Sequence, residues 1–275
     1  MKQSNLMAKI ARAPYILWAA IFIVVPLLIV VYYAFTDSSG SFTLANLAEL
    51  VQYKETFLLF LWYSLIATFI TLLISYPFAF FMSRKGPNAQ RMMLLLVMLP
   101  MWMNLLIRTY SWMNILERNG IINNLLGMLG IEPLTMIGTG GAVILGMIYN
   151  YLPYMILPIY TVMSKIDPLL LEAAEDLGAN NLAKLRRVIL PLSKPGVISG
   201  IAMVFVPSIS TFYISQKLGG GKIMLIGDVI ERQIQTAYNY NLGAAISLIL
   251  MILVLLSMAV VNRWAGKDEE GGVIF

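Results

Sequence analysis

The side chains that could do chemistry are restricted first by two absences, because the sequence contains no cysteine and no histidine. Without cysteine there is no thiolate nucleophile, disulfide or Cys-ligated metal centre. Without histidine, the Ser-His hydrolases, the HExxH zinc enzymes and His-ligated haem are excluded. An intramembrane enzyme would therefore have no obvious base or nucleophile.

The chain also has no segment of the form G-x-x-x-x-G-K-[ST], which cradles the phosphates of ATP in P-loop proteins. Its two Gly-Lys pairs, Gly221-Lys222 and Gly266-Lys267, continue with Ile and Asp. We expect no catalytic site, no cofactor and no metal in this chain. Any ATP-driven work must draw its energy from a partner.

The polar group that stands out within an apolar stretch is Arg108, in PMWMNLLIRTYSWMNIL, with Trp102, Tyr110 and Trp112 around it. A charge in lipid is costly and is a functional candidate by default. However, Arg108 lies near the end of its stretch, where it could snorkel to the interface. The rings could form an interfacial belt, or face a pathway and attract an organic cation. A structural role at the interface and a functional role in a pathway remain equal alternatives for Arg108.

The composition places these residues in a membrane protein. Of 275 residues, 59% are hydrophobic and 12% are charged, about half the charge of a soluble domain, and the mean hydropathy is +0.79. A membrane-spanning helix needs about 20 mostly apolar residues. Six stretches qualify, and we predict an all-α polytopic protein with one transmembrane domain over residues 1–275. The spans lie near 14–35, 57–82, 92–114, 141–163, 195–216 and 242–262.

Orientation follows from the lysines and arginines, which collect in cytoplasmic loops. If the N-terminus is inside, thirteen of the nineteen lie in inner segments and five in outer segments, with Arg108 inside a span. Both termini are therefore expected in the cytoplasm. The excess of basic residues is explained by topology, so we expect a bilayer and no nucleic acid as partner. Five of the six spans contain proline, which suits a transporter better than a passive anchor.

The inner loop at 164–194 has the pattern of two short amphipathic helices. Asp167-Pro168 is a strong helix start, and Gly178 is a typical stop. Between them, one face carries small and apolar residues and the other carries acids. The second helix would be capped by Asn180 or Asn181, carry a basic face, and end at Pro191. The acidic face disfavours a loop lying on anionic lipid, and the apolar face favours docking in a groove of a partner protein.

This loop resembles the EAA motif of bacterial ABC-importer permeases, EAA-x3-G-x9-I-x-LP, with Val188 in place of the isoleucine. The resemblance covers the chain from about the second span to the sixth. It implies the fold of an ABC type I importer permease, whose coupling helix docks on an ATP-hydrolysing subunit. The motif positions that would carry this contact are Glu172, Ala173, Ala174, Gly178, Leu190 and Pro191.

A second set of segments is similar to the B-type permeases of spermidine/putrescine ABC importers. These segments are LPMWMNLLIRTYSWMNIL, LPYMILPIYTVMSKIDPLLLEAAEDLGA and FYISQKLGGGKIMLIGDVIERQ. The resemblance implies polyamine import across a bacterial inner membrane by alternating access. It implies four kinds of partner: a second related permease, two copies of a cytoplasmic ABC ATPase that binds ATP and Mg, an extracytoplasmic polyamine-binding protein, and the bilayer.

Asp228 and Glu231 could serve such a cargo, since carboxylates at i, i+3 share one side of a helix. They could meet ammonium groups, or simply pair with Lys222 and Arg232, which we favour slightly. Together with Trp102, Arg108 and Tyr110 they are the candidate pathway residues. Two alternatives remain: an ABC permease for an amino acid or anion, which Arg108 would suit, and an ion-coupled secondary transporter. The latter would need carboxylates in mid-membrane, and the core of these spans contains none.

Overall fold

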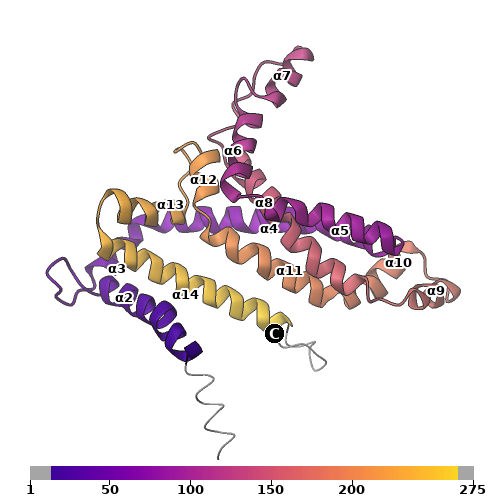
Figure 1. The fold of residues 1–275 in the computed structure, drawn as a ribbon, viewed down its shortest axis with the longest axis horizontal. Coiled ribbons are helices and arrows are strands. Elements are labelled where there is room, and N and C mark those ends of the chain that lie inside the picture. The colour runs from indigo at the N-terminus through magenta and orange to yellow at the C-terminus, as the bar shows by residue number, and fades with distance from the viewer. Residues whose placement is uncertain (1–13, 266–275) are drawn as a thin grey trace, which may run out of the picture. The chain divides into compact units, whose positions relative to one another are not determined.

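The computed structural model describes residues 14–265, and the regular elements of this part of the chain are helices, with one isolated bridge between Thr36 and Phe42 (Figure 1). The first helix runs from Pro14 to Ala34 and contains a π-helical turn. The elements in chain order are η1 Ala20–Val24, α2 Val25–Ala34, α3 Ala45–Glu49, η2 Leu50–Tyr53, α4 Lys54–Ser83, α5 Pro87–Trp102, α6 Leu105–Leu116, α7 Ile121–Met128, α8 Gly140–Met163, α9 Pro168–Asp176, α10 Asn181–Lys184, η3 Leu185–Ile189, α11 Leu190–Ser210, α12 Tyr213–Leu218, α13 Ile226–Glu231, η4 Arg232–Thr236 and α14 Tyr240–Ala265.

Five helices in the described residues are long and apolar enough to cross a membrane, and a bent pair of helices would make a sixth span. The five correspond to the first, second, fourth, fifth and sixth predicted stretches. Their bounds are Pro14–Ala34, Ala45–Ser83, Gly140–Met163, Asn181–Ser210 and Tyr240–Val261.

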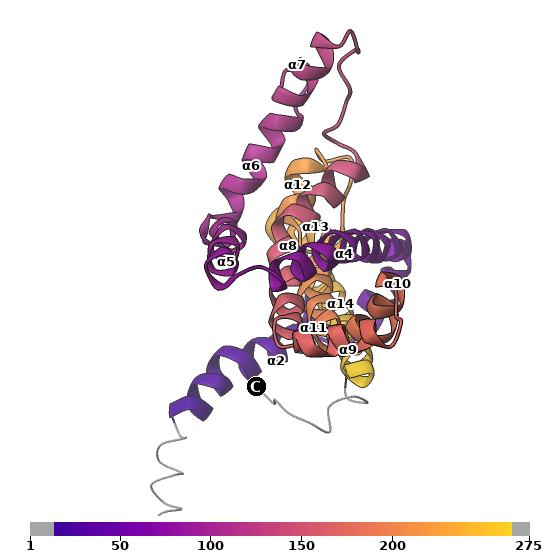
Figure 2. The ribbon, with the colours of Figure 1, turned by 90° about the vertical axis from the view of Figure 1, so that its right-hand side faces the viewer.

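The third predicted span, 92–114, is not one helix. The chain bends by 93° between α5 and the α6–α7 segment, and Figure 2 shows α6 and α7 extending away from α5. The break has a local cause, because the Asn104 side chain accepts a hydrogen bond from the Leu106 N–H at 2.7 Å and so caps a new helix. Pro100, which lies one turn before, has no N–H to donate within α5.

The prediction that Pro191 ends a short helix is wrong. The chain is helical without interruption from Asn181 to Ser210, through α10, η3 and α11. The π-helical turn η3 precedes Pro191 and widens the backbone there, and Pro191 lies in the first turn of α11. Because the helix is continuous through this point, Pro191 lacks an N–H to donate and its ring would crowd the preceding turn of an α-helix, and the wider π-helical turn before it accommodates the proline. The fifth span therefore begins within the predicted loop.

The chain forms two compact units, and the first comprises the described residues up to Glu55 together with Val229–Leu253. In this unit, α2 and the first half of α14 share a small core of Ala34, Ala244, Ala245 and Leu248. The carbonyl groups at the end of α2 are satisfied by side-chain amides. Asn46 donates to the Ala34 oxygen at 3.1 Å, and Asn241 donates to the Thr36 oxygen at 2.7 Å.

In the second unit, Thr56–Asp228 and the described residues from Val254, α11 packs along α8. Two glycines four residues apart on α11 allow the backbones to approach. A Cβ at Gly196 would lie 2.8 Å from the Pro158 oxygen, and one at Gly200 would lie 2.6 Å from the Met155 sulfur. This is the small-xxx-small arrangement by which membrane helices pack closely.

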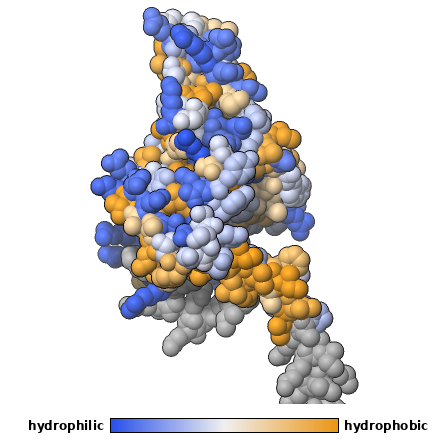
Figure 3. All heavy atoms as spheres, turned by 90° about the vertical axis from the view of Figure 1, so that its left-hand side faces the viewer, coloured by the Kyte–Doolittle hydropathy of each residue, from blue (hydrophilic) through white to orange (hydrophobic). Residues whose placement is uncertain are grey.

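Apolar side chains remain exposed over the spanning helices, as a bilayer requires. On the face shown in Figure 3, they cover the first helix, where Ile16, Phe22 and Leu28 are exposed. On α4 the exposed apolar residues include Phe69, Leu73 and Phe81. Lipid or another subunit must cover these surfaces.

We predict that Gly196→Val destabilises the protein by about 1–3 kcal/mol, because the added methyl groups meet backbone atoms of α8 that cannot move aside. The measurement is the melting temperature of the purified protein in detergent. The matched control is Gly127→Val on α7, where a Cβ meets nothing within 4 Å. Equal melting temperatures for the two variants would show that the α8–α11 approach is not tight.

Candidate functional site

The segment with the family-like motif forms the predicted helix α9, and its start is fixed as the sequence indicates. The Asp167 carboxylate accepts a hydrogen bond from the Leu169 N–H at 2.9 Å. Pro168 occupies the first helical position, where a missing N–H costs nothing. The capping prediction for this helix is confirmed.

The end of α9 is also as predicted. Gly178 has φ +82°, a left-handed conformation that suits glycine, and its N–H donates to the Glu175 oxygen at 2.8 Å. The next residue, Ala179, donates to the Ala174 oxygen at 2.9 Å. Asn180 then caps the following helix by accepting from the Ala183 N–H at 2.8 Å. The motif glycine is therefore required by backbone geometry.

The predicted apolar face of α9 points away from the rest of its unit. Leu177 is 89% exposed, and Leu169, Leu170 and Ala173 are exposed with it. Glu172 is exposed beside them. An exposed apolar patch on a short helix, rimmed by charge, is typical of a protein-interaction site.

The opposite face holds α9 to the helices behind it. Leu171 packs against the core cluster that includes Ile159, Met163 and the buried Ile166. Lys184, at the end of α10, forms a 2.9 Å ion pair with Glu175. Because α10 continues into α11, this ion pair links α9 to the start of a spanning helix.

Arg84 lies in the turn after α4 and reaches the chain between α8 and α9. Its Nη1 donates to the Ile166 oxygen at 3.5 Å, and its guanidinium carbon lies 5.4 Å from the centre of the Phe80 ring. Among the described residues, its Nε and Nη2 have no hydrogen-bond partner. Burial away from water lowers the pKa of the Arg84 guanidinium.

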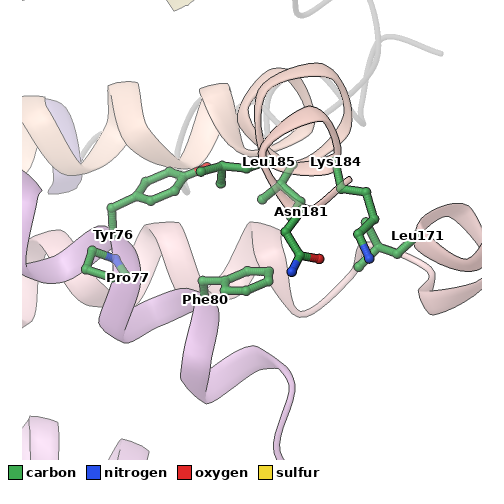
Figure 4. Close-up of a pocket in the computed structure, with 8 residues that line it drawn as sticks. Tyr76, Pro77, Phe80, Leu171, Asn181, Lys184 and Leu185 are labelled. Atoms are coloured by element: carbon green, nitrogen blue, oxygen red, sulfur yellow. The ribbon is translucent and has the colours of Figure 1, made fainter. Parts of the chain in front are cut away.

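A pocket of about 520 Å³ lies between α4, α9 and the helix that starts at α10 (Figure 4). Pro77 and Phe80 of α4 form one wall, and Leu185 faces them from η3. The Lys184 side chain extends toward Leu171 of α9. The exposed surface of the pocket is mostly apolar, although Asn181 and Lys184 also line it. Unfilled space therefore lies between α9 and the helices α4 and α10 that it packs against.

Of the candidate pathway residues, Arg108 is a buried charged side chain. It is 7% exposed on α6, and among the described residues its Nε and Nη1 have no hydrogen-bond partner. The guanidinium is buried among protein atoms, and a structural or a functional role for Arg108 both remain predictions. Trp102 is exposed at the end of α5, before the bend.

Tyr110 is brought together with residues that the sequence did not indicate. Its ring meets the ring of Tyr213, on α12, edge to face at 6.4 Å between centroids. The Lys217 ammonium lies 5.4 Å from the Tyr110 centroid and 5.7 Å from the Tyr213 centroid. Distances below about 6 Å are those of cation–π contacts. We call Tyr110, Tyr213 and Lys217 the ring–lysine cluster.

Asp228 and Glu231 both lie on α13. Asp228 is 8% exposed, and its Oδ2 accepts a hydrogen bond from the Leu225 N–H at 2.7 Å. The carboxylate thus satisfies a backbone donor just before α13. This contact gives Asp228 a structural role, and its predicted part in the pathway remains a prediction.

Two features that bear on the site were overlooked in the sequence although their signals are present. The first is the pair Gly196 and Gly200, a G-x-x-x-G pattern in the fifth predicted span. The second is a buried stripe of hydroxyl residues along α4, at spacings of three and four. The stripe consists of Ser64, Thr68, Thr71 and Ser75.

Comparisons with known proteins show the family to which the chain is similar. The family model described as "Binding-protein-dependent transport system inner membrane component" matches residues 1–266. The spermidine/putrescine transport system permease protein PotB of Haemophilus influenzae is 40% identical over 272 residues, covering 94% of each chain. PotB of Escherichia coli is 37% identical over 256 residues, covering 90% of this chain and 93% of its own.

Among solved structures, a bacterial ABC transporter involved in import of the acidic polysaccharide alginate superposes with a TM-score of 0.76. The two chains are 18% identical and each is covered to 98%, so the likeness concerns the fold alone. It confirms the predicted fold class, an all-helical polytopic permease of the type I importer kind.

We predict that Asp167→Ala removes about 1 kcal/mol of local stability from α9, because the Leu169 N–H loses its acceptor. Hydrogen exchange of the amides at 169–171 should then accelerate several-fold. The control is Asp176→Ala at the other end of α9, which removes a charge but no cap. If both variants accelerate exchange equally, the cap does not set the start of the helix.

Proposed function

The chain belongs to the family of inner membrane components of binding-protein-dependent transport systems, and from this premise we propose that it imports polyamines. It is a permease, a transport subunit with no ATPase motif of its own. The observation that supports a polyamine as the cargo is the 40% identity of this chain, over nearly the full length of both chains, to a spermidine/putrescine permease.

We further propose that α9 is the coupling helix. Its exposed apolar face, which ends at Leu177 and is flanked by Glu172, fits a groove on an ATP-hydrolysing subunit. Movement of that subunit would reach α11 by two routes. One is the Glu175–Lys184 ion pair, and the other is the packing of Leu171 on the helices behind.

Leu190 and Pro191 complete the motif without belonging to the exposed face of α9. They begin α11, directly after the π-helical turn. We propose that they carry the motion of α10 into the spanning helix. Ala173, Ala174 and Gly178 set how closely a partner can approach α9, because none of them has a long side chain.

The proposed topology places α9 and both termini in the cytoplasm, which the distribution of lysine and arginine supports. The residues at the two termini lie outside the described residues. In this orientation α9 faces a cytoplasmic ATPase, and the α6–α7 segment faces the side from which a binding protein delivers cargo. Two ATPase copies, a second related permease and an extracytoplasmic polyamine-binding protein complete the proposed assembly.

The proposed mechanism is alternating access driven by ATP. To move a two-state equilibrium from 1:99 to 99:1 takes about 5.5 kcal/mol, which ATP binding to the partner supplies through α9. A polyamine carries several positive charges and cannot cross hydrocarbon, so the path must be wet. This chain offers few carboxylates, and the second permease is proposed to supply more of the lining.

A second candidate is an ABC permease for an anionic solute. Arg108 favours it, because this buried cation has donors without partners in the described residues. The ring–lysine cluster favours the polyamine, because its rings already hold an alkylammonium group. The two candidates predict opposite cargo charges.

We predict that proteoliposomes containing the complete complex accumulate labelled spermidine or putrescine when ATP and the binding protein are supplied. The control contains an ATPase in which the P-loop lysine is replaced, and it should show no accumulation. Uptake without ATP would contradict the proposal. An anion that accumulates instead would establish the second candidate.

We predict that Glu172→Lys abolishes most uptake, since a reversed charge opposes docking of the partner on α9, while membrane insertion stays normal. The matched control is Glu132→Lys, which reverses an exposed charge in the segment between α7 and α8. Uptake and the ATPase retained on purification are measured together. Normal uptake in the Glu172 variant would remove this residue from the coupling contact.

A further inference from the structure

In the ring–lysine cluster, the ammonium at the end of an alkyl chain lies against two tyrosine rings. Tyr213 and Lys217 are four residues apart on α12, so their side chains share one side of that helix. Tyr110 comes from α6, which packs on α12, and completes the pair of rings. Two separate segments of the chain therefore meet around one ammonium group.

The group that these rings hold resembles the proposed cargo in its chemistry. A lysine side chain is an ammonium on a flexible four-carbon stem. Putrescine is the same four-carbon chain with an ammonium at each end, and spermidine has one such end. Aromatic faces attract both in the same way, through the ring quadrupole.

The cluster is open to a ligand. Tyr110 is 42% exposed, and Tyr213 and Lys217 are partly exposed. No salt bridge holds Lys217 among the interactions of the described residues. The Lys217 ammonium is held by the two rings and by a hydrogen bond with the Tyr110 side chain. A free ammonium can make the same contacts and so displace it at modest cost, since each contact is weak at an exposed site.

We propose that the Tyr110–Tyr213 ring pair is a binding subsite for the aminobutyl end of a polyamine, and that Lys217 is a tethered competitor for it. This deepens the proposed function and rests on it. Cargo enters the ring pair by displacing the Lys217 ammonium toward water. When the cargo moves on, Lys217 returns, so the subsite does not retain a cation that must be released.

The proposal predicts effects of opposite sign for neighbouring residues. Lys217→Met removes the competitor, so the complex should bind labelled putrescine about threefold more tightly, the scale of one exposed cation–π contact. Tyr213→Leu should weaken binding, and more so in the Lys217→Met background, where the cargo has full use of the rings. Tyr213→Phe keeps the ring face and should bind nearly as the parent does.

The experiment is equilibrium binding of labelled putrescine to the whole complex in lipid nanodiscs, without nucleotide. Lys217→Arg retains a cation for the rings and should leave affinity unchanged. Lys222→Met is the matched control for net charge, because it removes a lysine from the same outer segment. Each variant is checked for normal assembly by size-exclusion chromatography, and the Tyr213→Phe variant tests the rings if Tyr213→Leu fails to assemble.

Three results would overturn the inference. The first is an equal increase in putrescine affinity in the Lys217→Met and Lys222→Met variants, which would show that the effect comes from net charge alone. The second is a Tyr213→Leu effect of the same size with and without Lys217. The third is putrescine binding by the parent complex that Lys217→Met does not change, which would leave the proposed function intact. If the parent complex neither binds nor imports any polyamine, the proposed function itself fails.

Discussion

The close approach of α8 and α11 is the contact on which the second unit depends. Two glycines on α11 bring its backbone against Pro158 and Met155 of α8. Lipid provides no hydrophobic force between helices, so such packing must come from fitting surfaces and short distances. Because α11 continues back to Asn181 without interruption, this contact also fixes where α10 and α9 emerge.

Charge is scarce in this chain, and three of its basic side chains have specific partners in the described residues. Lys184 is paired with Glu175, and Lys217 lies against two rings. Arg84 is held at the junction of α8 and α9. These contacts lie at the proposed coupling helix and at the proposed cargo subsite. A buried or partly buried charge is expensive in a membrane protein and persists where it has a function.

Local rules in the sequence were sufficient for some elements and insufficient for others. Asp167, Pro168 and Gly178 define α9 correctly, because caps and a left-handed glycine act within a few residues. Pro191 was predicted to end a helix, but the helix continues through it because a π-helical turn accommodates the proline. No short sequence pattern predicts such a turn. The ring–lysine cluster could not be predicted, since it joins positions 110 and 213 from distant parts of the chain.

The central claim is that the exposed face of α9 meets the ATPase and moves with it. Because the chain contains no cysteine, a single cysteine gives cross-links without background from this subunit. Leu177→Cys should cross-link to the ATPase subunit of the assembled complex, with a yield that changes when ATP is added. Leu171→Cys, on the inward face, should not. Cross-linking from Leu171 with none from Leu177 would contradict the account.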